Sequence, residues 1–150
     1  MLKEGDPAPD ITLQTDRGEP LRLSSLRGKK VVLYFFPKAG TPGCTVEACE
    51  FRDASKQFSK KNAEIIGLSP DSVKSQSKFK DEYGLPFTLL ADADKSAAEA
   101  YGVYKEKNMY GRKVMGIERT TFVIGADGKI EKIYSKVKAK GHAAAVLAGL

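Results

Sequence analysis

Residues 31–36 restrict the fold more than any other segment, because six apolar or aromatic residues follow one another there without a break. The run is Val31-Val32-Leu33-Tyr34-Phe35-Phe36, and Pro37 ends it. Such a run is typical of a strand that is buried on both faces of a sheet. Residues 65–69 repeat the pattern and stop at Pro70. We therefore expect two central strands in a sheet that is covered on both sides.

The segments around these strands predict an α/β fold with a mixed central sheet flanked by helices. In chain order, the expected elements are a hairpin of 11–14 with 21–23, a strand at 31–36, a helix at 42–60, a strand at 65–69, a helix that ends at Tyr83-Gly84, a strand at 87–90, a helix at 97–101, a hairpin of 121–124 with 129–134, and a helix at 141–147. Asp71 is the expected N-cap of the second helix. A right-handed crossover places the start of the first helix beyond the carboxyl end of the first central strand, where open α/β sheets form their sites.

The length of 150 residues suits one domain, residues 1–150, because two smaller domains would lack stable cores. Charged residues make up 29% and hydrophobic residues 41%, which is typical of a folded rather than a disordered chain. The apolar runs are too short to span a bilayer, and the N-terminus lacks the apolar stretch of a signal peptide. We therefore expect a cytoplasmic protein that does not contact membranes.

The formal net charge of +6 raises the question of nucleic-acid binding, since basic patches are the electrostatic sign of it. Five lysines cluster towards the C-terminus: Lys129, Lys132, Lys136, Lys138 and Lys140. They alternate with apolar residues such as Ile130 and Ile133, which is the pattern of the solvent side of a strand and the tail after it. We predict no nucleic-acid partner.

The chain has two cysteines, Cys44 and Cys49, too few for a fold that depends on disulfides. A tetrahedral zinc site usually needs four ligands, and the only histidine, His142, is far along the chain. We therefore expect no metal and no cofactor. The two thiols are either inert buried groups or a reactive pair.

Cys44 lies where a helix is expected to begin. Pro42 suits the first helical position and Thr41 the N-cap, which makes Cys44 the third residue of the helix. Unpaired N–H groups and the positive end of the helix dipole favour a thiolate there. A free cysteine with a pKa of about 8.5 is only ~3% thiolate at pH 7, whereas a pKa near 6 would give ~90%. Gly43 lets a small substrate approach the backbone. The alternative is an inert cysteine on a helix that merely begins with Thr-Pro-Gly.

Cys49 follows Cys44 by five residues, which turns it about 140° away on a helix with Cα atoms roughly 8.6 Å apart. This exceeds the limit of ~7 Å for an unstrained disulfide. We expect Cys44 to share the core-facing side with Phe51 and Phe58, and Cys49 to face elsewhere. The cysteines can therefore join only if the helix unwinds, which fits a cycle with two conformations. The alternative is that Cys49 is a bystander.

The segment from Pro37 to Asp53 resembles the active-site segment of the peroxiredoxins, and more narrowly the bacterioferritin-comigratory or peroxiredoxin Q subfamily. It reads Pro37-Lys38-Ala39-Gly40-Thr41-Pro42-Gly43-Cys44-Thr45-Val46-Glu47-Ala48-Cys49-Glu50-Phe51-Arg52-Asp53. The resemblance covers nearly the whole chain. It implies a thioredoxin-like fold with an N-terminal hairpin extension. It also implies a thioredoxin-dependent thiol peroxidase that reduces hydrogen peroxide and organic hydroperoxides in antioxidant defence.

The resemblance also implies the roles of individual residues. Cys44 would attack the peroxide and become a sulfenic acid, with Thr41 orienting the peroxide and Pro37 shielding the pocket, of which Gly43 is also part. Cys49 would condense with the sulfenic acid to give a Cys44–Cys49 disulfide within the chain. Thioredoxin or a similar dithiol protein would reduce that bond. Members of the subfamily are often monomers, and we expect a monomer here.

Arg119 matches an arginine that the family uses at its site. A permanent cation would stabilise both the thiolate and the charge that develops as the O–O bond breaks. The alternative is a surface arginine at the start of a strand. Glu47 is a candidate to orient Arg119 through an ion pair, although acidic residues are common in first helical turns for dipole reasons alone.

Three further residues carry expectations from the resemblance. Phe36 and Ala39 stand where many relatives would carry a tyrosine and an acidic residue, so we expect a pocket of altered polarity with activity retained. His142 fits the family pattern, and we expect it at a helix start or on the surface rather than in catalysis.

Two other functions compete with the peroxidase. A thioredoxin-like disulfide oxidoreductase without peroxidase activity would normally carry Cys-x-x-Cys, in which both sulfurs meet across one helical turn. The spacing of Cys44 and Cys49 is wider. A basic binding module without enzyme activity would show steady nucleic-acid affinity and consume no peroxide.

Overall fold

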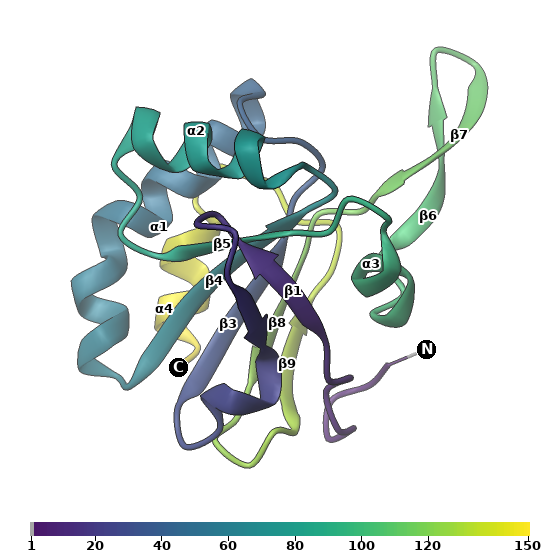
Figure 1. Ribbon diagram of the computed structural model, residues 1–150. Helices are drawn as coiled ribbons and strands as arrows, with labels where there is room; N and C mark the ends of the chain where they lie inside the picture. The colour runs from purple at the N-terminus through teal and green to yellow at the C-terminus, as the bar shows by residue number, and fades with distance from the viewer. Residues whose placement is uncertain (1) are drawn as a thin grey trace.

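The computed structural model describes residues 2–150, which form a seven-stranded mixed sheet and a separate two-stranded ribbon (Figure 1). The elements are β1 (Thr12–Thr15), β2 (Pro20–Arg22), the 3₁₀ helix η1 (Leu23–Leu26), β3 (Lys30–Phe35), α1 (Pro42–Lys60), β4 (Ala63–Ser69), α2 (Val73–Tyr83), β5 (Thr88–Ala91), α3 (Ser96–Ala100), β6 (Tyr104–Met109), β7 (Arg112–Ile117), β8 (Thr120–Ile124), β9 (Ile130–Tyr134) and α4 (His142–Ala148). The strand order of the large sheet is β2-β1-β5-β4-β3-β8-β9. The predicted α/β fold is confirmed.

The apolar run that ends at Pro37 forms the interior of the sheet. β3 pairs in parallel with β4 and antiparallel with β8. Val32 and Tyr34 pack into a core with α1, α2 and α4, whereas Val31 and Leu33 pack into a second core with α3 and η1. Burial of each such side chain contributes about 1.5–3 kcal/mol. Both faces of β3 are therefore covered, as the sequence predicts.

The hairpin β1–β2 extends the sheet at one edge. β1 pairs antiparallel with β2 and also with β5, through Gln14 opposite Ala91. The predicted N-terminal hairpin extension is therefore a continuation of the main sheet. At the other edge, β8 and β9 form the second predicted hairpin.

Helix α1 begins and ends at the predicted residues, Pro42 and Lys60. It buries Phe51 and Phe58 against the sheet, and the ring of Phe51 stacks on Tyr34 with centroids 4.7 Å apart. Because β3 ends at Phe35, the start of α1 lies just beyond the carboxyl end of a central strand. This places Cys44 at the edge of the sheet that the right-handed crossover predicts.

The prediction that Asp71 caps α2 is wrong. Ser72 is the N-cap, and its Oγ accepts a hydrogen bond from the backbone N–H of Ser75 at 3.1 Å. The carboxylate of Asp71 instead accepts hydrogen bonds from the backbone N–H of Ala39 at 2.9 Å and from Oγ of Ser69 at 2.6 Å. A capping serine directly after Asp71 frees this carboxylate to hold the loop that leads to α1.

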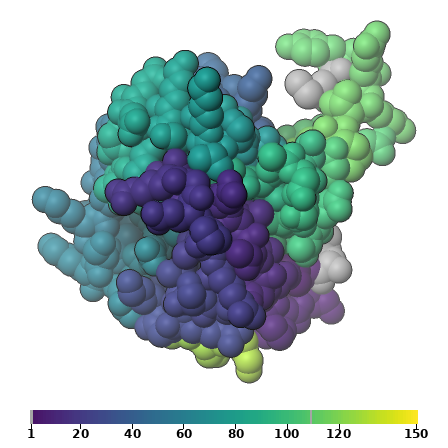
Figure 2. All heavy atoms as spheres, in the orientation of Figure 1, coloured from purple at the N-terminus to yellow at the C-terminus, as the bar shows by residue number. Residues whose placement is uncertain are grey.

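Strands β6 and β7 form a ribbon that the sequence did not predict. They pair only with each other within the described residues, and Tyr110 and Gly111 make the turn with φ of 53° and 78°. Two positive φ values are the mark of a type I′ hairpin turn. The ribbon stands clear of the body of the molecule (Figures 1 and 2).

The C-terminal lysines lie as expected. Lys129 and Lys132 are exposed at β9, whereas Ile130 between them is buried. Lys136, Lys138 and Lys140 are exposed in the segment that leads to α4. Among residues 2–150, no helix has both the length and the apolar character that crossing a membrane requires.

Candidate active site

Cys44 is the third residue of α1 and is 1% exposed. Thr41 occupies the N-cap position in extended conformation, but its hydroxyl donates to the carbonyl oxygen of Lys38 at 2.8 Å rather than capping the helix. Thr45 Oγ1 donates to the carbonyl oxygen of Thr41 at 2.8 Å. The predicted helix-start position of Cys44 is confirmed, and the N-terminal N–H groups beside it keep their capacity to face an anion.

Arg119 connects Cys44 to Glu47. Its Nη2 donates to Sγ of Cys44 at 3.4 Å, and its Nη1 donates to Oε1 of Glu47 at 2.5 Å. Arg119 directly precedes β8, which pairs with β3, so the sheet brings it to the start of α1. A β-carbon at position 43 would lie 3.2 Å from Nη2 of Arg119, so Gly43 makes room for the guanidinium. This role of Gly43 could not be predicted from the sequence.

The charges of this group depend on its burial. Glu47 is fully buried, and desolvation raises its pKa from 4.5 to about 7 although Arg119 acts in the opposite direction. Burial opposes the charge of Arg119, but Glu47 and Cys44 outweigh it, so the pKa of Arg119 is raised. Oε2 of Glu47 has no hydrogen-bond partner among the described residues. A buried ionisable network with shifted pKa values is typical of functional sites.

Cys49 lies on the same continuous helix and is partly exposed, and both cysteines carry free thiols. Cys44 faces the core together with Phe51 and Phe58, as predicted. Arg52, at the turn after Cys49, donates through Nη1 to the carbonyl oxygen of Tyr83 at 2.8 Å. The helix beyond Cys49 is therefore attached to the end of α2.

Pro37, Thr41 and Gly43 lie in the loop and first helical turn between β3 and Cys44. The backbone N–H of Ala39 in this loop donates to Asp71, which fixes the loop against the end of β4. The structure thus collects on one edge of the sheet every residue that the sequence singled out for the site, except Cys49, which is one turn further along α1.

Comparison with known proteins identifies the family, because residues 4–133 match the AhpC/TSA family. The chain belongs to this family. Peroxiredoxin Bcp of Bacillus subtilis is 49% identical over 146 residues, which cover 97% of this chain and 93% of that protein. Peroxiredoxin Bcp of Escherichia coli is 42% identical over 146 residues, or 97% and 94% of the two chains.

Two solved structures support the same assignment. A serine variant of Xanthomonas campestris peroxiredoxin Q shares 43% identity and a TM-score of 0.89, over 93% of this chain and 88% of that one. A cysteine-to-serine variant of Xylella fastidiosa PrxQ shares 38% identity and a TM-score of 0.94, over 99% and 95%. The chain is a Bcp-type peroxiredoxin with a thioredoxin-like fold and is a thiol peroxidase, as its resemblance implied.

The two departures of this peroxiredoxin from the expected pattern have different surroundings. Phe36 is fully buried among aromatic rings, with centroids 5.4 Å from Tyr34 and 5.9 Å from Phe79. Ala39 is half-buried and bonds Asp71 through its backbone, which any residue at this position can do. The altered polarity of the pocket stays a prediction.

His142 begins α4, which is one of the two positions expected for it, and its side chain is buried rather than on the surface. Its Nε2 lies 2.7 Å from Oγ1 of Thr121, and its ring meets the rings of Phe51 and Tyr134 edge-on. Burial lowers the pKa of His142 to about 4, with a smaller contribution from Arg119 in the same direction. A neutral histidine thus anchors α4 to β8.

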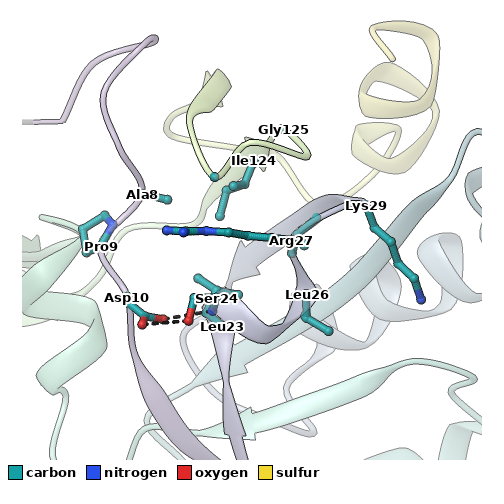
Figure 3. A pocket seen from close by; sticks show the side chains of 12 residues that line it. Ala8, Pro9, Asp10, Leu23, Ser24, Leu26, Arg27, Lys29, Ile124 and Gly125 are labelled. Carbon is teal, nitrogen blue, oxygen red and sulfur yellow. Dashed lines mark hydrogen bonds between the residues drawn. The ribbon is translucent and has the colours of Figure 1, made fainter.

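A small cavity lies at the other end of the sheet (Figure 3). It has a volume of about 20 Å³, and Arg27 and Ile124 are among its lining residues. Ile124 pairs with Val31 at the start of β3, whereas Cys44 follows the end of this strand. Asp10 beside the cavity accepts two hydrogen bonds from Ser24, each 2.9 Å long. The cavity is large enough for about one water molecule and takes no part in the site.

Proposed function

We propose that Cys44 is the peroxidatic cysteine of this peroxiredoxin and that it reduces hydrogen peroxide and organic hydroperoxides. The contact between Arg119 Nη2 and Cys44 Sγ, 3.4 Å long at a helix N-terminus, carries this proposal. The thiolate attacks one peroxide oxygen, the O–O bond breaks, and the second oxygen leaves with a proton as water or alcohol. Cys44 then carries a sulfenic acid. Arg119 stabilises the thiolate and the negative charge that develops on the leaving oxygen.

The inclusion of organic hydroperoxides is supported by a relative. A structure of Xanthomonas campestris bacterioferritin comigratory protein, 42% identical with a TM-score of 0.89, is described for its alkyl peroxide reduction activity. Val46, exposed two residues after Cys44, adds an apolar side chain near the site.

Thr41 and Pro37 position the substrate in this proposal. Because the hydroxyl of Thr41 donates its proton to Lys38, its oxygen keeps lone pairs that accept a hydrogen bond from the peroxide O–H. Pro37 has no backbone N–H and shields the pocket from water. Gly43 keeps the space between the helix start and Arg119 open to guanidinium and substrate.

Cys49 is the resolving cysteine in this proposal. Its thiolate attacks the sulfenic sulfur of Cys44, water leaves, and an intramolecular disulfide forms. The first turns of α1 must unwind, since an intact helix keeps the two Cα atoms about 8.6 Å apart. Thioredoxin or a similar dithiol protein then reduces the disulfide.

We propose further that residues 1–150 act as one domain and as a cytoplasmic monomer. A single large sheet that includes both the first and the last strand supports one domain. The match to relatives over nearly their full length supports it too. An intramolecular disulfide needs no second subunit, which fits a monomer.

Cysteine variants test these roles. Cys44→Ser should abolish peroxide consumption with any reductant, since the nucleophile is gone. Cys49→Ser should complete one fast turnover and then stall with thioredoxin as reductant. Peroxide consumption by Cys44→Ser would refute the peroxidatic role, and full thioredoxin-dependent turnover by Cys49→Ser would refute the resolving role.

A further inference from the structure

Most of the strongly exposed apolar side chains of this protein lie on the β6–β7 ribbon. Among the side chains that the structure describes, the large hydrophobic ones with strong exposure are Val46 (42%), Tyr110 (100%), Val114 (38%) and Met115 (53%). Val46 is on the first turns of α1, and the other three are on the β6–β7 ribbon. Single exposed apolar residues are ordinary, but three on one short ribbon are typical of an interaction surface.

Most of the ribbon takes no part in the core. Among its described side chains only Ile117 is buried, and Tyr104 packs against the same core at the base of the ribbon. Within the described residues, β6 and β7 pair only with each other, and the ribbon projects at the end of the molecule where α1 begins (Figures 1 and 2). An isolated two-stranded ribbon is marginally stable, and its outer edges leave backbone groups unpaired. Contact with a partner would bury these edges.

The base of the ribbon is joined directly to the redox site. β7 ends at Ile117, two residues before Arg119. Lys105 Nζ lies 3.2 Å from Oε2 of Glu118, which fixes the base. The side chain of Lys107 lies close to the backbone of Gly116, because a β-carbon at position 116 would be 3.2 Å from Cδ of Lys107. Burial and the charge of Arg119 lower the pKa of Lys107, and Glu118 and Cys44 act in the opposite direction. A partner that binds along the ribbon and reaches its base is thus brought close to Arg119 and Cys44.

The positive charge of the ribbon indicates that a protein partner would be acidic. Residues 104–117 carry four cations, Lys105, Lys107, Arg112 and Lys113, against one carboxylate, Glu106, which gives a net charge of +3. Near the tip, Lys113 reaches Glu106 only at 3.8 Å, and Arg112 is exposed. A second copy of this chain, itself +6, would be repelled, whereas an acidic protein would be attracted.

We propose that the β6–β7 ribbon is the docking surface for an acidic dithiol protein that reduces the oxidised enzyme, an inference that rests on the proposed Cys44–Cys49 disulfide. A thiolate of the partner attacks one sulfur of this disulfide, so that the Cys44–Cys49 bond breaks and a mixed disulfide forms. The second thiol of the partner then breaks the mixed disulfide. Two electrons and two protons pass to Cys44 and Cys49, and the partner is left with a disulfide.

Steady-state kinetics with two reductants test this docking surface. The reductants are an acidic thioredoxin, kept reduced by its reductase, and dithiothreitol, which needs no docking. In the double variant Arg112→Glu/Lys113→Glu, kcat/KM for thioredoxin should fall about tenfold or more at low salt, because steering is lost. The loss should shrink as salt rises, and turnover with dithiothreitol should stay unchanged. Tyr110→Asn, which suits the positive φ of the turn, should also lower kcat/KM for thioredoxin.

The matched control is Lys56→Glu/Lys60→Glu, which changes the net charge equally at the far end of α1 and should leave kcat/KM for thioredoxin unchanged. Equal kcat/KM for thioredoxin in the wild type and the ribbon variant would overturn the inference. The inference would also be overturned if the ribbon variant lost binding to a short DNA duplex while its kcat/KM for thioredoxin stayed unchanged. A wild type that turns over with dithiothreitol but not with thioredoxin would overturn the reductant assignment itself. Failure of the Cys49 role is seen separately, in Cys49→Ser.

Discussion

Arg119 binds two partners with one side chain, and its geometry explains why an arginine is needed. Nη2 contacts the sulfur of Cys44 while Nη1 contacts the carboxyl group of Glu47. A guanidinium presents these donors in a fixed plane, whereas the ammonium of lysine is a single point charge on a flexible chain. Arg119 therefore both stabilises charge at sulfur and is held in place to do so.

Two replacements of Arg119 should show how much of its effect on the reaction rate comes from its charge and how much from its two contacts. Arg119→Met should slow sulfenic acid formation by about a hundredfold or more, the usual cost of losing a donor at developing charge. Arg119→Lys should be slowed less, because it keeps the charge and loses the second contact. Rapid-mixing kinetics in a single turnover measure this step. Arg112→Met is the control, and a rate for Arg119→Met equal to that of this control would contradict the role.

Glu47 should make stability depend on pH. Its folded-state pKa of about 7 is above the ordinary value of 4.5, so its contribution is fully present below pH 4.5 and is lost as pH rises through 7. The loss is about 3 kcal/mol. Glu47→Gln lacks this loss, so its free energy of unfolding relative to the wild type should rise between pH 4.5 and 7. Urea unfolding of both proteins at both pH values measures this difference in the free energy of unfolding. The same difference at pH 4.5 and pH 7 would contradict the prediction.

The effect of His142 on folding stability has the opposite pH dependence over part of this pH range. Its pKa is lowered from 6.5 to about 4, so its contribution is present above pH 6.5 and is lost as pH falls towards 4. In the wild type the two effects oppose each other. In Glu47→Gln the effect of His142 remains, which sets the sign of the slope expected for that variant.

At the scale of elements, α1 carries both cysteines and must change shape for them to meet. Two contacts hold the chain on either side of the segment that separates them. Asp71 holds Ala39 before the helix, and Arg52 binds the carbonyl oxygen of Tyr83 after Cys49. Between these contacts, the ion pair of Glu47 with Arg119 is the main polar link of α1 to the sheet. We therefore expect the helix to unwind between Ala39 and Arg52.

Hydrogen exchange tests this region directly. Oxidation by peroxide should raise the exchange rate of amides in residues 45–49, because their helical hydrogen bonds open, while the amides around Phe58 stay protected. Cys49→Ser treated in the same way is the control, since it forms the sulfenic acid and cannot form the disulfide. Equal protection of residues 45–49 in the reduced and oxidised wild type would contradict the proposed unwinding.

The elements that bury one or both faces could be predicted from the sequence, and the ribbon could not. Strands such as 31–36 follow patterns that burial imposes, and α1 is marked at its start by Thr41 and Pro42. Among the described side chains of the ribbon at 104–117 only Ile117 is buried, so burial does not impose a period of two there. The role of Asp71 could not be predicted because the partner of its carboxylate, Ala39, is distant in the sequence.

The same distinction applies to the site. The position of Cys44 could be predicted from its neighbours in the sequence, because Thr41 and Pro42 mark the start of a helix. The pairing of Arg119 with Glu47, 72 residues away, depends on the packing of β8 beside β3. With 25 lysines and arginines in the chain, only the family resemblance indicated Arg119. The buried position of His142 likewise follows from the packing of α4, which the sequence does not reveal.

At the scale of the whole molecule, the structure separates a fixed body from a reactive end. Two cores on opposite faces of the sheet hold the strands and the far part of α1. Cys44, Arg119, the loop at 37–41 and the base of the ribbon lie together at the carboxyl end of β3. A rearrangement confined to this end leaves most buried surface in place, so the body keeps the two cysteines within reach of each other throughout the cycle.

Mass spectrometry of the intact, reduced protein after one equivalent of hydrogen peroxide tests the central claim most directly. A disulfide within one chain removes two hydrogens from the monomer mass, and peptide mapping then joins Cys44 to Cys49. We predict this mass loss, this crosslink and no covalent dimer. A chain that keeps a stable sulfenic acid on Cys44, or that links to a second chain, would contradict the account.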